Sequence, residues 1–175
     1  MSGQLFAKGA VALTASGMSG ETLHSSVDIP AGLMEAGRVV KFCACIKVDT
    51  DGGPDTWQVR VRLGGVSGTL VLACNDLDAD AHSTGFIEGY FVVVSEGTTD
   101  GIVSGAASGY GTAIASVTGA TLVGTNTMTD ANTNAPFTLA ITSQCSTTSP
   151  DESVQVTFLR AWVEAGMGTV ETPLP

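Results

Sequence analysis

The sequence has little charge, and positive charge is the scarcest. Only 14% of its 175 residues are Asp, Glu, Lys or Arg, compared with about 25% in a typical soluble domain. Lys and Arg number 7 against 17 Asp and Glu, so the net charge is −10. A protein that binds a nucleic-acid backbone needs a basic surface, and these few cations cannot supply one. We therefore expect no nucleic-acid partner, and a low-charge surface that is largely covered by another molecule.

Long apolar runs are also missing. No stretch approaches the roughly 18 residues that a membrane-spanning helix needs, so we expect no membrane partner. Met1–Ala15 lacks the apolar core of a secretory signal, which predicts a protein made in a cytoplasm. Hydrophobic residues still reach 43% and are spread along the chain, which excludes disorder. A chain of this length predicts one domain, residues 1–175.

Residues typical of catalytic and metal sites are few. The two histidines, His24 and His82, belong to no recognisable catalytic motif. A hydrolase that uses His82, Ser83 and a nearby Asp is conceivable, but adjacency in sequence does not make a triad. We expect no enzyme and no cofactor. Free, buried or half-buried thiols are expected at all four cysteines, with a structural zinc as the weaker alternative: Cys43, Cys45, Cys74 and Cys145.

Two acidic loops raise the question of calcium. One is Asp49–Asp55 (DTDGGPD) and the other is Asp76–Asp80 (DLDAD). Neither has the spacing of an EF-hand loop, so we interpret both as solvated turns and predict no metal site. Calcium binding remains the alternative for each loop.

A period of two dominates the rest of the chain and predicts strands with one buried face. Apolar residues alternate with polar ones over Val39–Val48 and again over Thr56–Leu63. Gly64 and Gly65 end the second of these strands, and Gly68–Cys74 reads as the return strand of a hairpin. Gly85–Ser95 is apolar on both faces, which predicts a central strand.

Two further strands are predicted with specific inward faces. In Thr22–Ile29, we expect Leu23 in the core and His24 on the opposite face. In Ser153–Glu164, we expect Phe158 and Trp162 to join Val154 and Val156 on the apolar face, with Arg160 interrupting it. A strand with alternating apolar residues is expected at 136–142, and weaker, glycine-rich strands are expected at residues 102–107, 112–117 and 121–125.

Helix signals are poor, with at most one helical turn in Ala31–Gly37, and the polar stretch Gly124–Ala135 suggests a surface loop. The pattern predicts an all-β fold, a β-sandwich of eight or more strands and in particular a jelly roll. We assign residues 21–165 to the sandwich and residues 1–20 to an N-terminal arm or edge strand. Residues 166–175 are expected to form an extended C-terminal tail.

Four of the seven basic residues fall on non-core strand faces: Lys41, Lys47, Arg60 and Arg62. If they share one sheet face, they form a possible interface to an acidic partner or to acidic loops of a neighbouring copy. The alternative is a set of cross-strand ion pairs with nearby Glu or Asp.

Aromatic residues make up only 6% of the chain. Phe42, Trp57, Phe137 and Trp162 are expected on core faces, which leaves Tyr110 as the aromatic in an exposed, loop-like context. With the glycine-rich stretch 97–111, Tyr110 supports a carbohydrate-binding module only weakly.

The order of several segments resembles small β-sandwich virion proteins of tailed bacteriophages. The segments are TLHSSVDIPAG at residues 22–32, the strand 38–48, DTWQVRVRLGG at 55–65, the central strand, and WVE at 162–164. The resemblance covers roughly residues 20–165. It implies a non-enzymatic jelly-roll subunit of a phage particle, and decoration (cement) proteins of this type usually form trimers on the outer shell.

From this resemblance we expect a homo-oligomer, with a trimer favoured, that binds the major capsid protein. The expected location is the virion, at the capsid surface, after synthesis in the host cytoplasm. The alternative function is a head-fibre or tail-associated adhesion module that binds host glycans.

Overall fold

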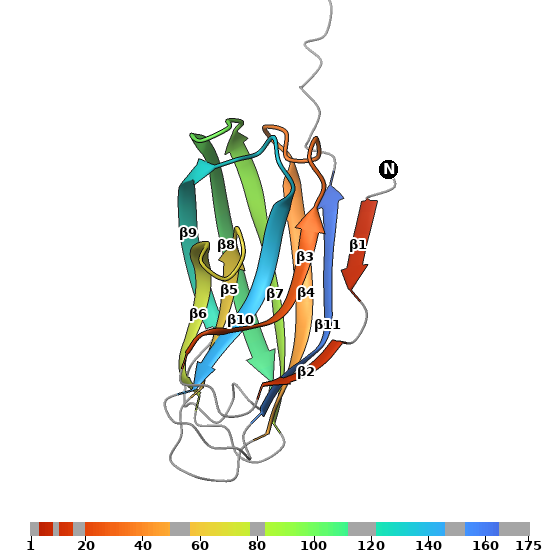
Figure 1. The fold of residues 1–175 in the computed structure, drawn as a ribbon, viewed down its shortest axis with the longest axis vertical. Coiled ribbons are helices and arrows are strands. Elements are labelled where there is room, and N and C mark those ends of the chain that lie inside the picture. The colour runs from red at the N-terminus through yellow and green to blue at the C-terminus, as the bar shows by residue number, and fades with distance from the viewer. Residues whose placement is uncertain are drawn as a thin grey trace, which may run out of the picture.

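The computed structural model describes residues 4–8, 11–15, 20–49, 57–77, 83–111, 122–145 and 153–164. These residues form strands and turns with no helix, and hence no helix that could cross a membrane. The strands make two antiparallel sheets that pack face to face, with the four-stranded sheet nearer the viewer in Figure 1. The fold is therefore the predicted all-β sandwich.

The wide sheet has seven strands and the order β1-β11-β4-β7-β8-β9, with β2 also paired to β11. Its strands are β1 (Gln4–Lys8), β2 (Val11–Ala15), β4 (Val39–Asp49), β7 (Ser83–Ser95), β8 (Gly101–Gly111), β9 (Leu122–Ala131) and β11 (Ser153–Glu164). The narrow sheet has the order β3-β10-β5-β6. Its strands are β3 (Thr22–Ile29), β5 (Trp57–Leu63), β6 (Thr69–Leu77) and β10 (Phe137–Cys145).

The chain passes repeatedly from one sheet to the other, from β3 to β4, from β4 to β5 and from β6 to β7, and later through β10 to β11. Strands distant in sequence therefore become neighbours, as where β10 lies between β3 and β5. This connectivity is that of a jelly-roll sandwich. Along one side β6 lies against β9, which brings the two sheets together there.

The core lies between the sheets and comes from alternate residues of nearly every central strand. On β4 the inward residues Val40, Phe42, Ala44 and Ile46 are all buried, as the period of two predicts. On β5 the inward residues Val59, Val61 and Leu63 are buried as well. The rings of Phe91 and Phe137 lie with their centroids 5.8 Å apart, so side chains of the two sheets pack directly against each other here.

The predicted inward face of β11 is correct up to Val156 and wrong for the residues that follow. Val154 and Val156 are buried, but the register with β4 shifts between Val156 and Phe158, which leaves Thr157 as an extra residue. The Thr157 hydroxyl donates a hydrogen bond to the carbonyl of Cys45 at this bulge. A one-residue insertion exchanges the two faces of a strand. Leu159, Ala161 and Val163 therefore enter the core, and Phe158 and Trp162 turn outward with Arg160.

A second bulge overturns the prediction for β3. The register with β10 passes from Ser25 opposite Ile141 directly to Leu23 opposite Thr142, so His24 is the extra residue. His24 is fully buried, whereas Leu23 is 38% exposed on the outer face. The expected positions of these two side chains are therefore exchanged.

Two predicted local structures also differ. The stretch Gly124–Ala135 is not a surface loop for most of its length, because β9 continues through it to Ala131 and pairs with β8. Its threonine-rich sequence suits an extended edge strand despite its polarity. Ala31–Gly37 forms turns instead of a helical turn, with Gly32 and Gly37 at φ of 83° and 82°.

Both N-terminal strands pair with β11 of the same chain. Residues Gln4–Lys8 run antiparallel to Leu159–Val163, and Figure 1 shows β1 at the outer edge of the wide sheet. The expected tail at 166–175 and the predicted strand at 112–117 lie outside the described residues.

Candidate functional site

The four basic residues singled out from the sequence do not share one face. Lys41 and Lys47 belong to β4 in the wide sheet, and Arg60 and Arg62 belong to β5 in the narrow sheet. Each pair alternates with buried residues, so each pair points out of the sandwich on its own side. The expectation of a single basic face is wrong, because strands consecutive in sequence fall in different sheets.

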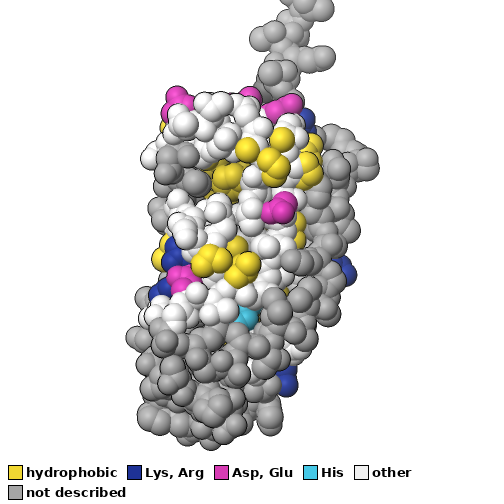
Figure 2. Space-filling model, viewed as in Figure 1, with side chains coloured by type: hydrophobic (Ala, Val, Ile, Leu, Met, Phe, Trp, Pro, Cys, Tyr) yellow, Lys and Arg dark blue, Asp and Glu magenta, His cyan; other side chains and the backbone are white. Residues whose placement is uncertain are grey.

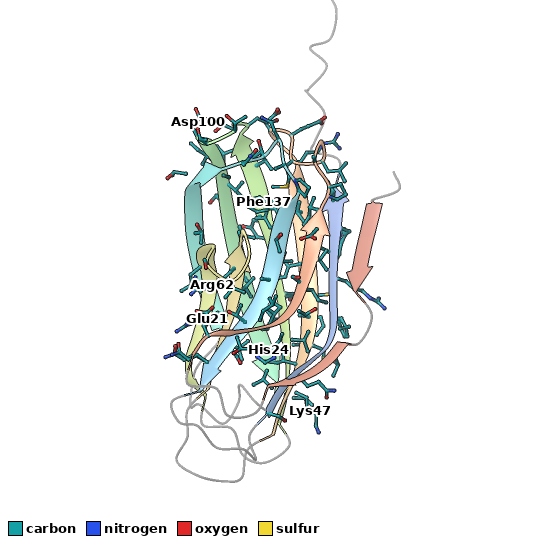
Figure 3. The ribbon with its side chains drawn as sticks, viewed as in Figure 1. Glu21, His24, Lys47, Arg62, Asp100 and Phe137 are labelled. Carbon is teal, nitrogen blue, oxygen red and sulfur yellow. The ribbon has the colours of Figure 1, made fainter. Side chains whose placement is uncertain are left out.

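Arg60 and Arg62 converge on Glu21, which directly precedes β3. Arg60 Nη1 lies 2.5 Å from Glu21 Oε2, and Arg62 Nε lies 2.5 Å from Glu21 Oε1. The Thr142 hydroxyl also donates to this carboxylate, and Arg62 Nη1 donates to the carbonyl of Gly68 at 2.8 Å. Figure 3 shows Glu21 beside Arg62 on the narrow sheet. These contacts form a cluster, which we call the Glu21 cluster, that spans β10 and ties the start of β3 to β5.

The Glu21 cluster is largely shielded from water, since the Glu21 side chain is 16% exposed and each arginine side chain 17%. Burial alone would raise the pKa of the carboxyl group. The hydrogen bonds from Arg62, Thr142 and Arg60, together with the charge of Arg62, outweigh burial and lower the pKa from 4.5 to about 2. The carboxylate therefore stays ionised, and both arginines share it, so the cluster is hydrogen-bonded within the chain but keeps one net positive charge.

Lys41 lies on the other outer face, in a different setting. Its Nζ is 2.8 Å from Glu164 Oε1, but both side chains are more than 40% exposed, so this ion pair is a weak one. Lys47 also projects from β4 and lies near one end of the sandwich (Figure 3).

A groove of about 440 Å³ lies on this outer face of the wide sheet. Trp162, Lys41, Tyr90 and Ala106 form one row across the strands β11, β4, β7 and β8. The next row continues from Glu88 to Ser108. Large side chains on β4, β7 and β11 thus stand beside small ones on β8, and this step in height forms the groove. Its lining comprises Lys41, Phe42, Glu88, Gly89, Tyr90, Ala106, Ala107, Ser108 and Trp162.

Aromatic side chains continue along the same outer face beyond the groove. The rings of Phe86 and Phe158 lie 6.2 Å apart, and the Arg160 guanidinium sits 5.5 Å from the centre of the Phe158 ring. Half-buried Cys43 lies next to this group. The pKa of its thiol is raised, and burial is the main cause. The sequence pattern missed this face because it placed Phe158 and Trp162 in the core.

His24 is a buried residue that is hydrogen-bonded to a serine. Its Nε2 lies 2.6 Å from the hydroxyl oxygen of Ser143, and both residues are fully buried. A histidine and a serine at this distance resemble part of a hydrolytic site, but the pair has no access to solvent. We assign it to the core, where it satisfies polar groups beside the bulge in β3.

Several predictions lie on residues that the structure does not describe. His82, the centres of both acidic loops and the side chains of Cys74, Cys145, Trp57 and Tyr110 are among them. The backbone of Tyr110 belongs to β8 and pairs with Phe86, so the strand expected at 102–107 continues to Gly111, through the position where Tyr110 was expected in a loop. Within the described ranges, no three His, Cys, Asp or Glu side chains gather as metal ligands would.

No family model and no curated protein sequence matches this chain. Among solved structures, it is similar to VP2 of infectious bursal disease virus in a subviral particle, with 10% identity and a TM-score of 0.43. That match covers 94% of this chain but only 33% of VP2, so the chain spans about a third of the viral protein.

Legume lectins give matches of the same strength. Peanut lectin has 6% identity and a TM-score of 0.44, with 94% of this chain and 98% of the lectin covered. The lectin UEA-II, solved in complex with galactose, has 8% identity and a TM-score of 0.42, with 92% and 93% covered. Likenesses of this size carry no conclusion about the function of this chain.

Proposed function

We propose that this chain is a non-enzymatic structural subunit of a virus particle, a capsid decoration (cement) protein of the tailed-bacteriophage kind. The order of sequence segments that resembles such proteins supports this proposal, together with the two-sheet sandwich fold. The observation that carries it is the chemistry of the outer face of the narrow sheet, which we call the docking face.

The docking face combines charged side chains that are hydrogen-bonded within the chain with exposed apolar side chains. The two arginines share the Glu21 carboxylate in the Glu21 cluster, and Leu23 beside them is 38% exposed. Val66, 36% exposed, stands in the turn whose Gly68 carbonyl accepts from Arg62. Figure 2 shows this face, where patches of hydrophobic side chains lie among backbone and uncharged polar atoms, with a few charged side chains between them. Exposed Asp28 of β3 is one of these, and it accepts a hydrogen bond from the Thr138 hydroxyl.

Such a surface suits permanent contact with another protein. The cores of protein interfaces are depleted of free charge, and burying unpaired ions would cost binding energy. In our proposal the docking face binds the major capsid protein, and each bound subunit stabilises the shell by mass action. In a closed homo-oligomer, for which we propose a trimer, symmetry gives every protomer the same docking face towards the shell.

The proposal is tested by cosedimentation of the full chain with phage shells that lack it. Leu23→Lys places a charge on the docking face and should weaken shell binding by about tenfold or more. Val94→Lys is the matched control, since Val94 is 55% exposed on the opposite face and should bind normally. Light scattering should give three times the 17.7 kDa chain mass. A monomer that does not bind shells would overturn the proposal, as would a loss caused by Val94→Lys alone.

A further inference from the structure

The groove on the wide sheet is a second surface feature, separate from the docking face by the full thickness of the sandwich. Its volume of about 440 Å³ falls within the range of small-molecule sites. It is built on four central strands, so its walls are held by the sheet and not by loops. A ligand would therefore meet a preformed surface, which lowers the entropic cost of binding.

Two aromatic side chains belong to the row that forms the groove. Trp162 and Tyr90 lie on either side of Lys41, and neighbouring strands are about 4.8 Å apart, which separates the two backbones by roughly 10 Å. Tyr90 is 48% exposed, and Trp162 is half-buried. Each presents a flat apolar surface with a polar tip, which suits a ligand that has both an apolar ring face and a polar rim.

The polar groups of the groove include both signs of charge. Lys41 supplies a hydrogen-bond donor whose charge is compensated by Glu164 2.8 Å away, Glu88 supplies an exposed carboxylate, and Ser108 supplies a hydroxyl. A phosphate would meet the repulsion of Glu88, and a guanidinium group would meet that of Lys41. A neutral molecule whose hydroxyl groups both donate and accept hydrogen bonds matches this mixture.

We propose that the groove binds one pyranose ring of a carbohydrate. The ring's apolar C–H face stacks on Tyr90, the more exposed of the two aromatic side chains, and its hydroxyls accept from Lys41 and donate to Glu88. This site goes beyond the proposed structural function, because it lies opposite the docking face and would remain open on a subunit bound to a shell. It gives the particle a means of contacting surface glycans.

The test is saturation-transfer NMR of the full chain with free glucose, galactose, mannose, fucose and N-acetylglucosamine, each at about 10 mM, since a single stacked ring is expected to bind with a Kd of about 1 mM. At least one sugar should show transfer to its ring protons. Tyr90→Ala should weaken that binding by about tenfold. Val94→Ala, on the same strand but outside the groove lining, should leave it within about twofold.

Circular dichroism of both variants establishes that each is folded. Absence of transfer from all five sugars would overturn the inference, as would equal losses in the two variants. Binding of N-acetyl-arginine amide in place of any sugar would overturn it too, and would assign the groove to a basic peptide. None of these results depends on shell binding, so the two proposals fail separately.

Discussion

Replacing Glu21 by Gln removes one negative charge from the point where two guanidinium groups converge. Gln has nearly the same shape and can still accept a hydrogen bond, so the change tests charge and not packing. Arg60 and Arg62 would then keep their positive charges at 17% side-chain exposure without an acidic partner. An uncompensated and poorly hydrated charge destabilises the folded state.

The size of the effect follows from the pKa of Glu21, which folding lowers from 4.5 to about 2. At about 1.4 kcal/mol per pKa unit, this difference corresponds to roughly 3 kcal/mol of stability at neutral pH. Water reaches the edge of the cluster, so we expect about 2–3 kcal/mol to be lost in Glu21→Gln. For a chain of this length, the midpoint of thermal unfolding should fall by roughly 5–10 °C.

The same pKa shift fixes the pH dependence. Because the folded-state pKa lies below the unfolded one, this contribution is complete above pH 4.5 and is lost as the pH falls towards about 2. The free energies of unfolding of the two proteins should therefore differ most at neutral pH and converge near pH 2.

Urea unfolding followed by tryptophan fluorescence measures both quantities. Glu164→Gln is the matched control, because its ion pair with Lys41 is more than 40% exposed and should contribute less than about 1 kcal/mol. A neutral-pH loss in Glu21→Gln no larger than in this control would refute the reasoning. So would a difference that persists undiminished at about pH 2.

Two further substitutions test the core. Gly89→Ala should lower the free energy of unfolding by about 1–3 kcal/mol, because the added Cβ would lie 2.6 Å from Cζ of Phe42. Calorimetry measures the unfolding midpoint of this variant against that of Gly20→Ala, whose added Cβ would meet no atom within 4 Å. Equal midpoints for the two variants would contradict it. Ser143→Ala should cost about 1–3 kcal/mol, since the buried His24 ring loses a 2.6 Å hydrogen bond, and an unchanged urea midpoint would show that this bond contributes nothing.

Much of the fold follows from local pattern. The alternation in β4 and β5 predicts their buried faces residue by residue, because successive side chains of a strand must point to opposite sides. The glycine pair at 64–65, with φ of 91° and 88°, correctly marks the turn of a hairpin. Composition alone made a basic nucleic-acid interface implausible.

The candidate site depended on events that alternation cannot show. A bulge at Thr157 turns Phe158 and Trp162 outward, and a bulge at His24 buries a histidine and exposes Leu23. The sequence of neither segment indicates where the extra residue falls, because its position is set by hydrogen bonds with strands that are distant in the chain. Without knowledge of the bulge at Thr157, the groove lined by Trp162 could not be predicted.

The sequence by itself determined most of the strand segments, where the hairpin turns, and how little charge the chain carries, since these depend on neighbouring residues and on composition. The tertiary structure alone decided that Lys41 and Arg60 lie on opposite faces, that two arginines share Glu21, and that Tyr90 and Trp162 line one groove. The physical reason is that sheet assignment and register are settled by long-range pairing, in which a shift of one residue exchanges the inside of a strand for its outside.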